Sequence, residues 1–178
     1  LNDYSTYRYG VKNKKASEAV ALLANSVYKA PHRTENILCA RPSLTATTTT
    51  TWGPSAKPAY SQDSLFAALN SLLSIDDEYI VNSETYRFDL SNVCRQLLTG
   101  IAYNKLQKVR ESYSVKTKEA FRASSKDFLD LILFADTVTA AMPRFSFYEW
   151  QQDAQKQATN SSDSAQFLWN ARRLVTLW

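Results

Sequence analysis

The sequence predicts an all-α protein, folded as an antiparallel bundle of about six helices with one long Pro/Thr-rich loop or short extended segment. The length of 178 residues and the hydrophobic content of 44% suit one domain with a packed core. Only three glycines occur, and β-rich folds need many more positions where φ is positive. Apolar residues also recur about every 3.6 residues along most of the chain, which is the period of an amphipathic helix.

The first residues, 1–10, are expected to be the end of a helix that enters from a preceding region. Leu1, Tyr4 and Tyr7 have helical spacing, and Gly10 is typical of the glycine that follows a helix. The chain begins without methionine and ends on the apolar run RRLVTLW, whereas natural termini are usually polar and loose. We therefore expect 11–178 to be an incomplete helical domain of a longer protein, with a processed mature chain as the alternative.

The first full helix is expected from a cap at Asn13 or Ser17 to about Lys29. Residues 30–60 then hold four of the five prolines and the threonine run 47–51. We interpret this region as an ordered loop, or an extended segment, over the domain surface.

Five further helices complete the prediction. They are expected from Ser61 to about Ser74–Asp76, over 83–113, over 121–138 with an end before Pro143, over 146–159, and over 162–174. Gly100 lies inside the longest of them, where glycine costs about 1 kcal/mol relative to alanine, so we expect a close helix crossing or a bend there. Helices of this length joined by short connections pack antiparallel.

The composition excludes several functional classes. Three scattered glycines cannot form a dinucleotide-binding or Walker-type loop, and the single histidine excludes an HExxH zinc site. Cys39 and Cys94 show no CxxC spacing, and whether they pair stays open. We therefore expect no cofactor and no metal. The net charge of +4 is spread among interleaved acidic and basic residues, and no apolar run approaches a membrane span, so we expect no nucleic-acid or membrane partner.

Two groups of polar residues could carry chemistry. His32 lies in the loop with Arg33 and Glu35, where it could be a general base or a substrate-binding donor, or an exposed residue without a role. The acidic run 76–78 could serve acid–base chemistry or bind a cation, but it also suits a solvated helix end. Aromatic residues concentrate on the later helices; most are expected in the core, although tryptophans at an exposed end would suit stacking against a sugar.

A cluster near the start of the longest helix is interpreted as structural. Arg87, Asp89, Arg95 and Gln96 lie within ten residues, and Asp89 is placed to cap the helix or to pair with an arginine. We favour a buried bidentate Arg–Asp pair that fixes two elements together. A substrate-binding arginine is the alternative.

The same segment, YRFDL at 86–90 followed by Arg95-Gln96, resembles the Y-R-Y-D-L…R-Q signature in the C-terminal helical domain of glycoside hydrolase family 89, the α-N-acetylglucosaminidases. Three other segments are similar to that family in the same order: YRYG at 7–10, CARPSL at 39–44 with Trp52-Gly53, and WNAR at 169–172 with TLW at 176–178. The resemblance covers nearly the whole chain.

The resemblance implies a retaining exo-glycosidase that removes terminal α-linked N-acetylglucosamine in a secreted, periplasmic or lysosomal setting. Its two catalytic glutamates would lie on a (β/α)8 barrel outside this chain, so the chain alone would be inactive. The helical C-terminal domain would pack on that barrel and contribute part of the sugar-pocket wall. Trp178 and His32 are the substrate-binding residues that the resemblance implies.

A rival interpretation is an independent helical protein-interaction module without catalytic role, which would bind a partner on its aromatic face. Such a module should have capped, polar ends. A domain cut from a longer protein should instead leave apolar surface bare at Leu1 and near Trp178.

Overall fold

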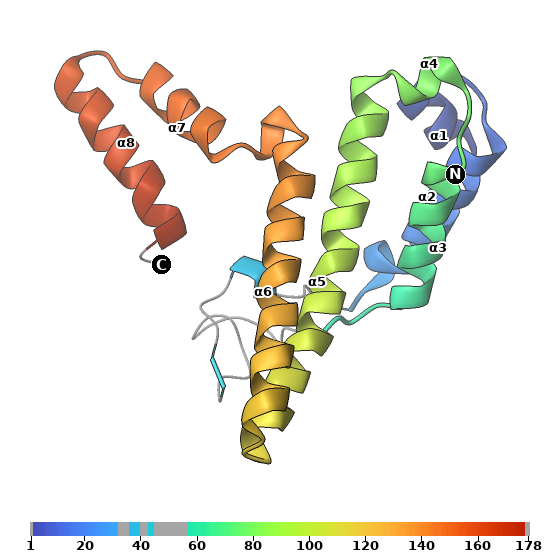
Figure 1. The fold of residues 1–178 in the computed structure, drawn as a ribbon. Helices are drawn as coiled ribbons and strands as arrows, with labels where there is room; N and C mark the ends of the chain where they lie inside the picture. Colours follow the sequence, from blue (N-terminus) through green and yellow to red (C-terminus); the bar gives the residue numbers. More distant parts are fainter. Residues whose placement is uncertain (1, 32–35, 40–42, 45–56, 177–178) are drawn as a thin grey trace. The chain divides into compact units, whose positions relative to one another are not determined.

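The computed structural model describes residues 2–31, 36–39, 43–44 and 57–176 (Figure 1). Within these ranges the regular structure consists of α-helices and short 3-10 helices, so the all-α prediction is confirmed. The helices are α1 (Asn2–Tyr9), α2 (Lys14–Asn25), η1 (Val27–Lys29), η2 (Ile37–Cys39), α3 (Gln62–Leu73), α4 (Glu78–Val81), α5 (Glu84–Ser114), α6 (Lys118–Ala140), η3 (Pro143–Phe145), α7 (Phe147–Lys156) and α8 (Ser161–Thr176).

The chain divides into two compact units, Leu1–Val138 and Thr139–Trp178. We describe each unit by itself. The limits predicted from the sequence, 1–10 and 11–178, concern the organisation of a longer protein and stay a prediction.

The helix α1 ends at the predicted glycine. Gly10 has φ +78°, and its amide donates to the Thr6 carbonyl at 2.8 Å. The side chains of Ser5 and Tyr9 are buried on the inner face of the helix, whereas Tyr7 is 89% exposed. The left-handed backbone at Gly10 turns the chain so that α2 packs beside α1.

The cap of α2 is Asn13, whose side chain accepts a hydrogen bond from the Ala16 amide at 3.0 Å. The predicted end at Lys29 is wrong, because α2 ends at Asn25. Ser26 adopts φ −120° and ψ −89°, outside the helical region, and the chain then makes the short turn η1.

The helix α3 begins as predicted, with Ser61 accepting from the Ser64 amide at 3.2 Å. Near its end, Ile75 is buried whereas Leu73 is 59% exposed.

The short helix α4 was not predicted. Asp77 caps it by accepting from the Tyr79 and Ile80 amides at 3.0 and 3.2 Å. Asp77 therefore begins a new helix rather than only ending the previous one, because a carboxylate satisfies the free amides of a first turn.

The helix α5 follows the cap Ser83 and matches its predicted limits to within one residue. Tyr113, near the end of the helix, is 55% exposed. The predicted close crossing at Gly100 is confirmed. A Cβ built there would overlap the end of the Gln62 side chain of α3, so this side chain lies directly against the glycine.

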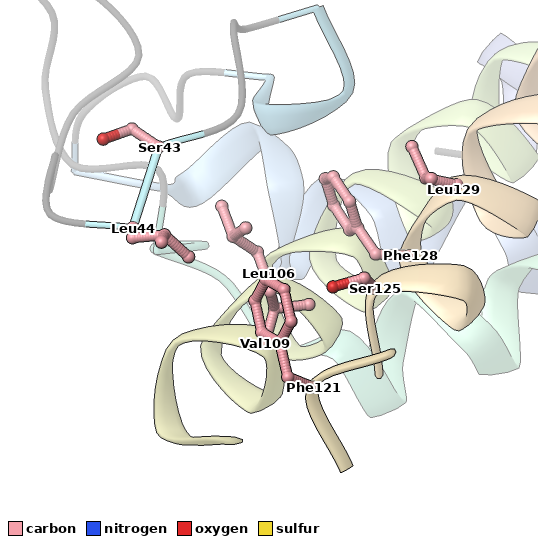
Figure 2. A pocket seen from close by; sticks show the side chains of 8 residues that line it. All are labelled: Ser43, Leu44, Leu106, Val109, Phe121, Ser125, Phe128 and Leu129. Atoms are coloured by element: carbon pink, nitrogen blue, oxygen red, sulfur yellow. The ribbon is translucent and has the colours of Figure 1, made fainter. Parts of the chain in front are cut away.

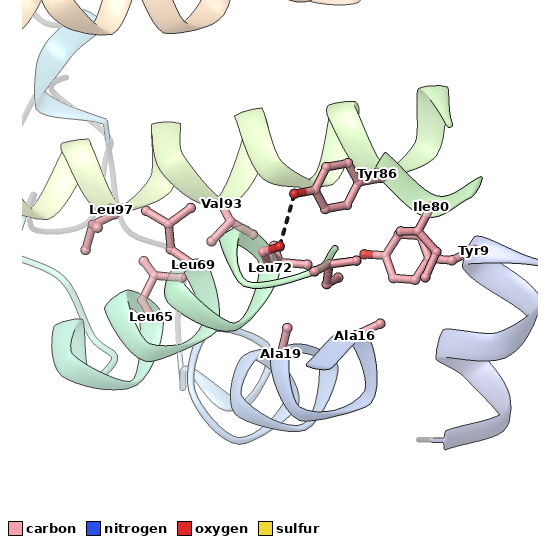
Figure 3. Close-up of a cluster of buried hydrophobic side chains, with 11 residues drawn as sticks. Tyr9, Ala16, Ala19, Leu65, Leu69, Leu72, Ile80, Tyr86, Val93 and Leu97 are labelled. Atoms are coloured by element: carbon pink, nitrogen blue, oxygen red, sulfur yellow. Dashed lines mark hydrogen bonds between the residues drawn. The ribbon is translucent and has the colours of Figure 1, made fainter. Parts of the chain in front are cut away.

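The main core lies between the helices α1 to α5 (Figure 3). The largest fully buried apolar side chains in it are Leu65, Leu72 and Ile80, each worth roughly 1.5–3 kcal/mol when removed from water. The Tyr86 hydroxyl donates to the Leu72 carbonyl at 3.0 Å. Together with the Gly100–Gln62 approach, this contact shows that α3 and α5 run antiparallel.

The helices α5 and α6 form an antiparallel hairpin with a second apolar cluster. Ala102, Leu106 and Val109 of α5 are buried in it with Phe128 of α6. Across the hairpin, Lys105 Nζ lies 2.9 Å from Asp127 Oδ2.

The second unit is largely the pair of helices α7 and α8, which correspond to the two last predicted helices. Ser146 caps α7 by accepting from the Glu149 amide at 3.4 Å. The expectation that most aromatic residues on the later helices are core holds for Tyr86 of α5 but not for the larger aromatic residues of α7 and α8. In this unit the larger exposed aromatic residues are Phe147, Tyr148, Trp150 and Trp169. Two helices alone present too little surface to cover such large side chains.

Candidate functional site

The two residues expected to bind sugar, His32 and Trp178, lie outside the described residues. Their roles stay predictions. The structure does describe parts of the loop that follows His32 and the helix that precedes Trp178. It also describes the four predicted structural residues, Arg87, Asp89, Arg95 and Gln96.

Asp89 is the acceptor of a three-donor cluster that joins α1 to α5. Arg8 Nε donates to Asp89 Oδ2 at 2.8 Å, and Arg8 Nη2 donates to Oδ1 at 2.6 Å. The Tyr9 hydroxyl donates to Oδ2 at 2.9 Å. The side chains of Arg8 and Asp89 are 30% and 20% exposed, so the pair is only partly hydrated.

The sequence indicated an Arg–Asp pair here but did not identify its arginine. Arg87, the second residue of the YRFDL segment, is exposed on α5. The partner is Arg8, which is 81 residues away in the chain. No local spacing relates Arg8 to Asp89, although Arg8 and Tyr9 belong to the YRYG segment that also resembled the family.

The electrostatics of this cluster follow from its geometry. The hydrogen bond to Asp89 is the main cause that raises the pKa of Arg8. Burial raises the pKa of Tyr9, and the negative charge of Asp89 raises it further. At physiological pH Arg8 is charged and Tyr9 is protonated, which is the state that the three hydrogen bonds require, and the shifts extend this state to higher pH.

The other two predicted structural residues have partners of their own. Arg95 Nη2 donates to the Asn92 side chain at 2.7 Å, one turn earlier in α5. The Gln96 amide nitrogen donates to the Tyr60 hydroxyl, which lies just before α3. Gln96 therefore ties the end of the long loop region to the middle of α5, whereas Asp89 ties down α1.

The loop after His32 is attached to α5 at two points. Thr99 Oγ1 donates to the Asn36 side chain at 3.2 Å, and Arg110 Nε donates to the Ser43 carbonyl at 3.1 Å. Ile37 between them is buried. These contacts agree with the interpretation of an ordered loop for the parts of 30–60 that the structure describes.

A small apolar cavity of about 200 Å³ lies between this loop and the α5–α6 hairpin (Figure 2). It is lined by Ser43, Leu44, Leu106, Val109, Phe121, Ser125, Phe128 and Leu129. Among the described residues that line it, the polar side chains are the two serines, so this lining suits apolar groups.

The helix α8, which precedes Trp178 in the chain, is joined to α7 by side-chain contacts. Trp150 Nε1 donates to the Ala171 carbonyl at 3.4 Å, and Arg172 Nε donates to the Gln151 side chain at 2.9 Å. The Arg173 guanidinium lies 5.0 Å from the centre of the Trp169 ring, which is the geometry of a cation–π contact. The first two contacts join the beginning of α7 to the end of α8, whereas the third lies within α8.

Cys39 and Cys94 are both free thiols in the structure. Burial raises the pKa of Cys94, which makes it a poor nucleophile at neutral pH. In the described parts of the chain, His, Cys, Asp and Glu side chains do not gather in groups of three or more suited to a metal. None of the described helices is long and apolar enough to cross a bilayer.

The chain is similar to known proteins over its whole length. Residues 1–178 match the family described as the α-N-acetylglucosaminidase (NAGLU) C-terminal domain. Two solved structures of a family 89 glycoside hydrolase from Clostridium perfringens, in complex with PUGNAc and with 2-acetamido-1,2-dideoxynojirmycin, share 28% identity with a TM-score of 0.87. A third, in complex with its substrate GlcNAc-α-1,4-galactose, gives the same values.

The match covers 99% of this chain but only 20% of the family 89 chains. No curated protein matches. Both the resemblance of the YRFDL segment and the fold therefore lead to one assignment: the chain belongs to the family of α-N-acetylglucosaminidase C-terminal domains.

Proposed function

We propose that residues 1–178 act as the helical domain of a longer retaining exo-α-N-acetylglucosaminidase. In that protein the domain packs on the catalytic (β/α)8 barrel and contributes part of the wall of the sugar pocket. The catalytic glutamates lie on the barrel, and the substrate is a glycan with a terminal α-linked N-acetylglucosamine. A secreted, periplasmic or lysosomal location suits such an enzyme.

The observation that carries this proposal is the family match over residues 1–178, joined with 28% identity to the Clostridium perfringens enzyme. That enzyme has been solved with GlcNAc-α-1,4-galactose, described as its substrate. The site geometry adds support, because Asp89 is paired with Arg8 and Tyr9 and the cavity beside α5 is lined mainly by apolar side chains.

Within the proposal, Trp178 stacks its indole on the apolar C–H face of the sugar, and His32 donates or accepts a hydrogen bond at the pocket edge. The contacts of Asn36 and Ser43 with α5 hold the loop that carries His32. Arg87, Asp89, Arg95 and Gln96 act as structural residues, and none of them touches substrate.

The test is a hydrolysis assay on an aryl α-N-acetylglucosaminide. We expect the full-length protein to hydrolyse it and the 1–178 polypeptide to show no activity. In the full-length protein, Trp178→Ala should lower kcat/KM roughly tenfold or more through lost transition-state stabilisation, and Trp178→Phe should keep part of it. Tyr113→Ala, at an exposed aromatic residue near the end of α5, is the control expected to leave kcat/KM unchanged.

Hydrolysis by the 1–178 polypeptide would contradict the division of labour. A full-length protein without activity on α-N-acetylglucosaminides would contradict the function itself. It would favour the rival, a helical interaction module, which the exposed aromatic residues of α7 and α8 would also suit.

A further inference from the structure

The turn that joins α7 to α8 carries an asparagine in a recognisable triplet (Figure 1). Asn160 is followed by Ser161 and Ser162, and it is the only asparagine of the chain with serine or threonine two positions later. A triplet of this kind, without proline in the middle, is the acceptor sequence for N-linked glycans on surface loops of secreted proteins. Because such triplets also arise by chance, the accessibility of the side chain and its role in the fold decide whether the site is usable.

The side chain of Asn160 caps the helix α8. Its Oδ1 accepts a hydrogen bond from the Asp163 amide at 2.9 Å, which satisfies one free amide of the first turn. Its Nδ2 donates to Asp163 Oδ2 at 2.9 Å and to Thr159 Oγ1 at 3.4 Å. A glycan replaces one of the two hydrogens on Nδ2 and leaves the carbonyl oxygen of the amide as it was. The cap through Oδ1 therefore does not have to break when Asn160 carries a sugar.

The turn around Asn160 is polar and open to solvent. Its exposed side chains are Gln157, Thr159, Asn160, Ser161 and Ser162. The helices of the hairpin run antiparallel, because Gln155 near the turn bonds Ser164, whereas Trp150 further from it bonds Ala171. The exposed apolar residues Phe147 and Val175 thus lie at the other end of the hairpin. A hydrophilic glycan on the turn would cover neither of them.

We propose that Asn160 is an acceptor site for an N-linked glycan when the longer protein passes through a eukaryotic secretory pathway. The inference goes beyond the proposed function and rests only on the secreted or lysosomal location within it. In the transfer, a bond forms between Asn160 Nδ2 and C1 of the first sugar of a lipid-linked oligosaccharide. The bond from that C1 to the lipid diphosphate breaks, the lipid diphosphate leaves, and the amide nitrogen loses one proton.

Helix capping alone is the rival explanation for Asn160. The cap bonds go to Asp163 and Thr159 and do not involve Ser162. Aspartate caps helices as well as asparagine does, but it has no amide nitrogen to which a sugar can be attached. The cap and the acceptor site can therefore be separated by substitution.

Peptide mapping tests whether the site is used. The full-length protein is secreted from cultured human cells, treated with peptide-N-glycosidase F and digested with trypsin, which releases residues 157–172. The glycosidase converts a glycosylated asparagine to aspartate, so we expect aspartate at position 160 in the mass spectrum. Asn170 in the same peptide has no acceptor triplet and should stay asparagine, and a sample without glycosidase controls for spontaneous deamidation. An unmodified Asn160 would overturn the inference.

Three variants separate glycan attachment from folding. Asn160→Asp keeps the cap, and Ser161→Pro places proline at the first helical position, which helices accept, but both destroy the acceptor triplet. We expect both to be secreted, to lack the glycan, and to have the Tm of the deglycosylated parent. Ser161→Ala keeps the triplet and is the matched control that should keep the glycan. A glycan at Asn160 in Ser161→Pro, or its loss in Ser161→Ala, would overturn the inference.

The glycan assay needs no catalysis, so it is independent of the hydrolysis assay. Hydrolysis of the aryl α-N-acetylglucosaminide by a protein without a glycan at Asn160 refutes this inference alone. A glycan at Asn160 on a protein without hydrolysis refutes the proposed function and leaves this site in place.

Discussion

Arg8 and Asp89 form a bidentate ion pair that joins α1 to α5 across 81 residues of sequence. The helix α1 has only eight residues, too few to persist alone in water. Its position therefore depends on this pair, on the Tyr9 hydroxyl bound to the same carboxylate, and on the burial of the Tyr9 ring.

Asp89→Asn should detach α1 from α5. Asparagine has the same size but no charge, so it leaves the partly buried Arg8 guanidinium without its carboxylate. We expect the free energy of unfolding of the first unit to fall by about 1–3 kcal/mol, a range already lowered for the partial exposure of the pair. Urea denaturation measures the loss, and hydrogen exchange should show faster opening of the α1 amides.

The control for this variant is Asp130→Asn. Asp130 pairs with Lys126 on the exposed surface of α6, where solvent screens the interaction. We expect no measurable change in stability there. An Asp89→Asn protein as stable as the parent would show that the Arg8–Asp89 pair does not hold α1 in place.

The Tyr9 hydroxyl should make the first unit sensitive to alkaline pH. The pKa of Tyr9 is raised above its usual value of about 10, first by burial and then by Asp89. Above pH 10 the unfolded chain loses the tyrosine proton while the folded chain keeps it, so stability falls as pH rises toward the folded pKa. The steepest expected slope is about 1.4 kcal/mol per pH unit.

Comparison of the parent with Tyr9→Phe isolates this contribution. Phenylalanine keeps the buried ring but lacks the ionising group, so the stability advantage of the parent should shrink between pH 9 and pH 11 in denaturation curves. Tyr7→Phe, at a residue 89% exposed, should leave the pH profile unchanged. A constant difference between the parent and Tyr9→Phe across this range would contradict the assignment.

The parts of the fold that depend on local sequence could be predicted. Caps such as Ser61 and Ser83, the stop at Gly10, and the apolar period of α5 act within one or two helical turns, so the sequence carries them directly. The end of α2 was misplaced because a serine in a non-helical conformation interrupts a pattern that stays apolar through Val27. The four-residue α4 is shorter than a periodic pattern can show.

Contacts between distant segments could not be predicted in the same way. The type of the Asp89 interaction was expected, but its partner Arg8 is selected by the packing of α1 on α5, which no spacing encodes. Likewise, the periodicity of α7 and α8 indicated helices with apolar faces but not that Phe147 and Val175 stay exposed. That exposure depends on what lies beside the hairpin.

Gly100→Ala should stabilise the protein less than alanine stabilises an open helix. The added Cβ would overlap the amide group of Gln62, which is the far end of a flexible side chain and has to move away. We expect the usual gain of about 1 kcal/mol to shrink toward zero because of this shift, as measured by urea denaturation.

A double-mutant cycle tests why the gain is reduced. In a Gln62→Ala background the Gln62 amide no longer occupies the space beside Gly100, so Gly100→Ala should give its full gain of about 1 kcal/mol there. If the two substitutions are instead additive, the close approach of Gln62 to Gly100 is not what reduces the gain.

Phe128 and Phe134 offer a matched test of the second apolar cluster on one helix. Phe128 is 3% exposed and packs with Leu106 and Val109 of α5, whereas Phe134 is 53% exposed. Phe128→Ala should lower the free energy of unfolding by about 3–5 kcal/mol, because it removes a buried ring and enlarges the neighbouring cavity. Phe134→Ala in the 1–178 polypeptide should cost under about 0.5 kcal/mol, as for other exposed positions.

Both substitutions remove the same atoms from α6 and carry the same change in helix propensity, so their difference in urea denaturation reports burial alone. Equal losses would mean that the α5–α6 hairpin is not held by this cluster, and the cavity beside Leu106 would then be a surface feature without a role in stability.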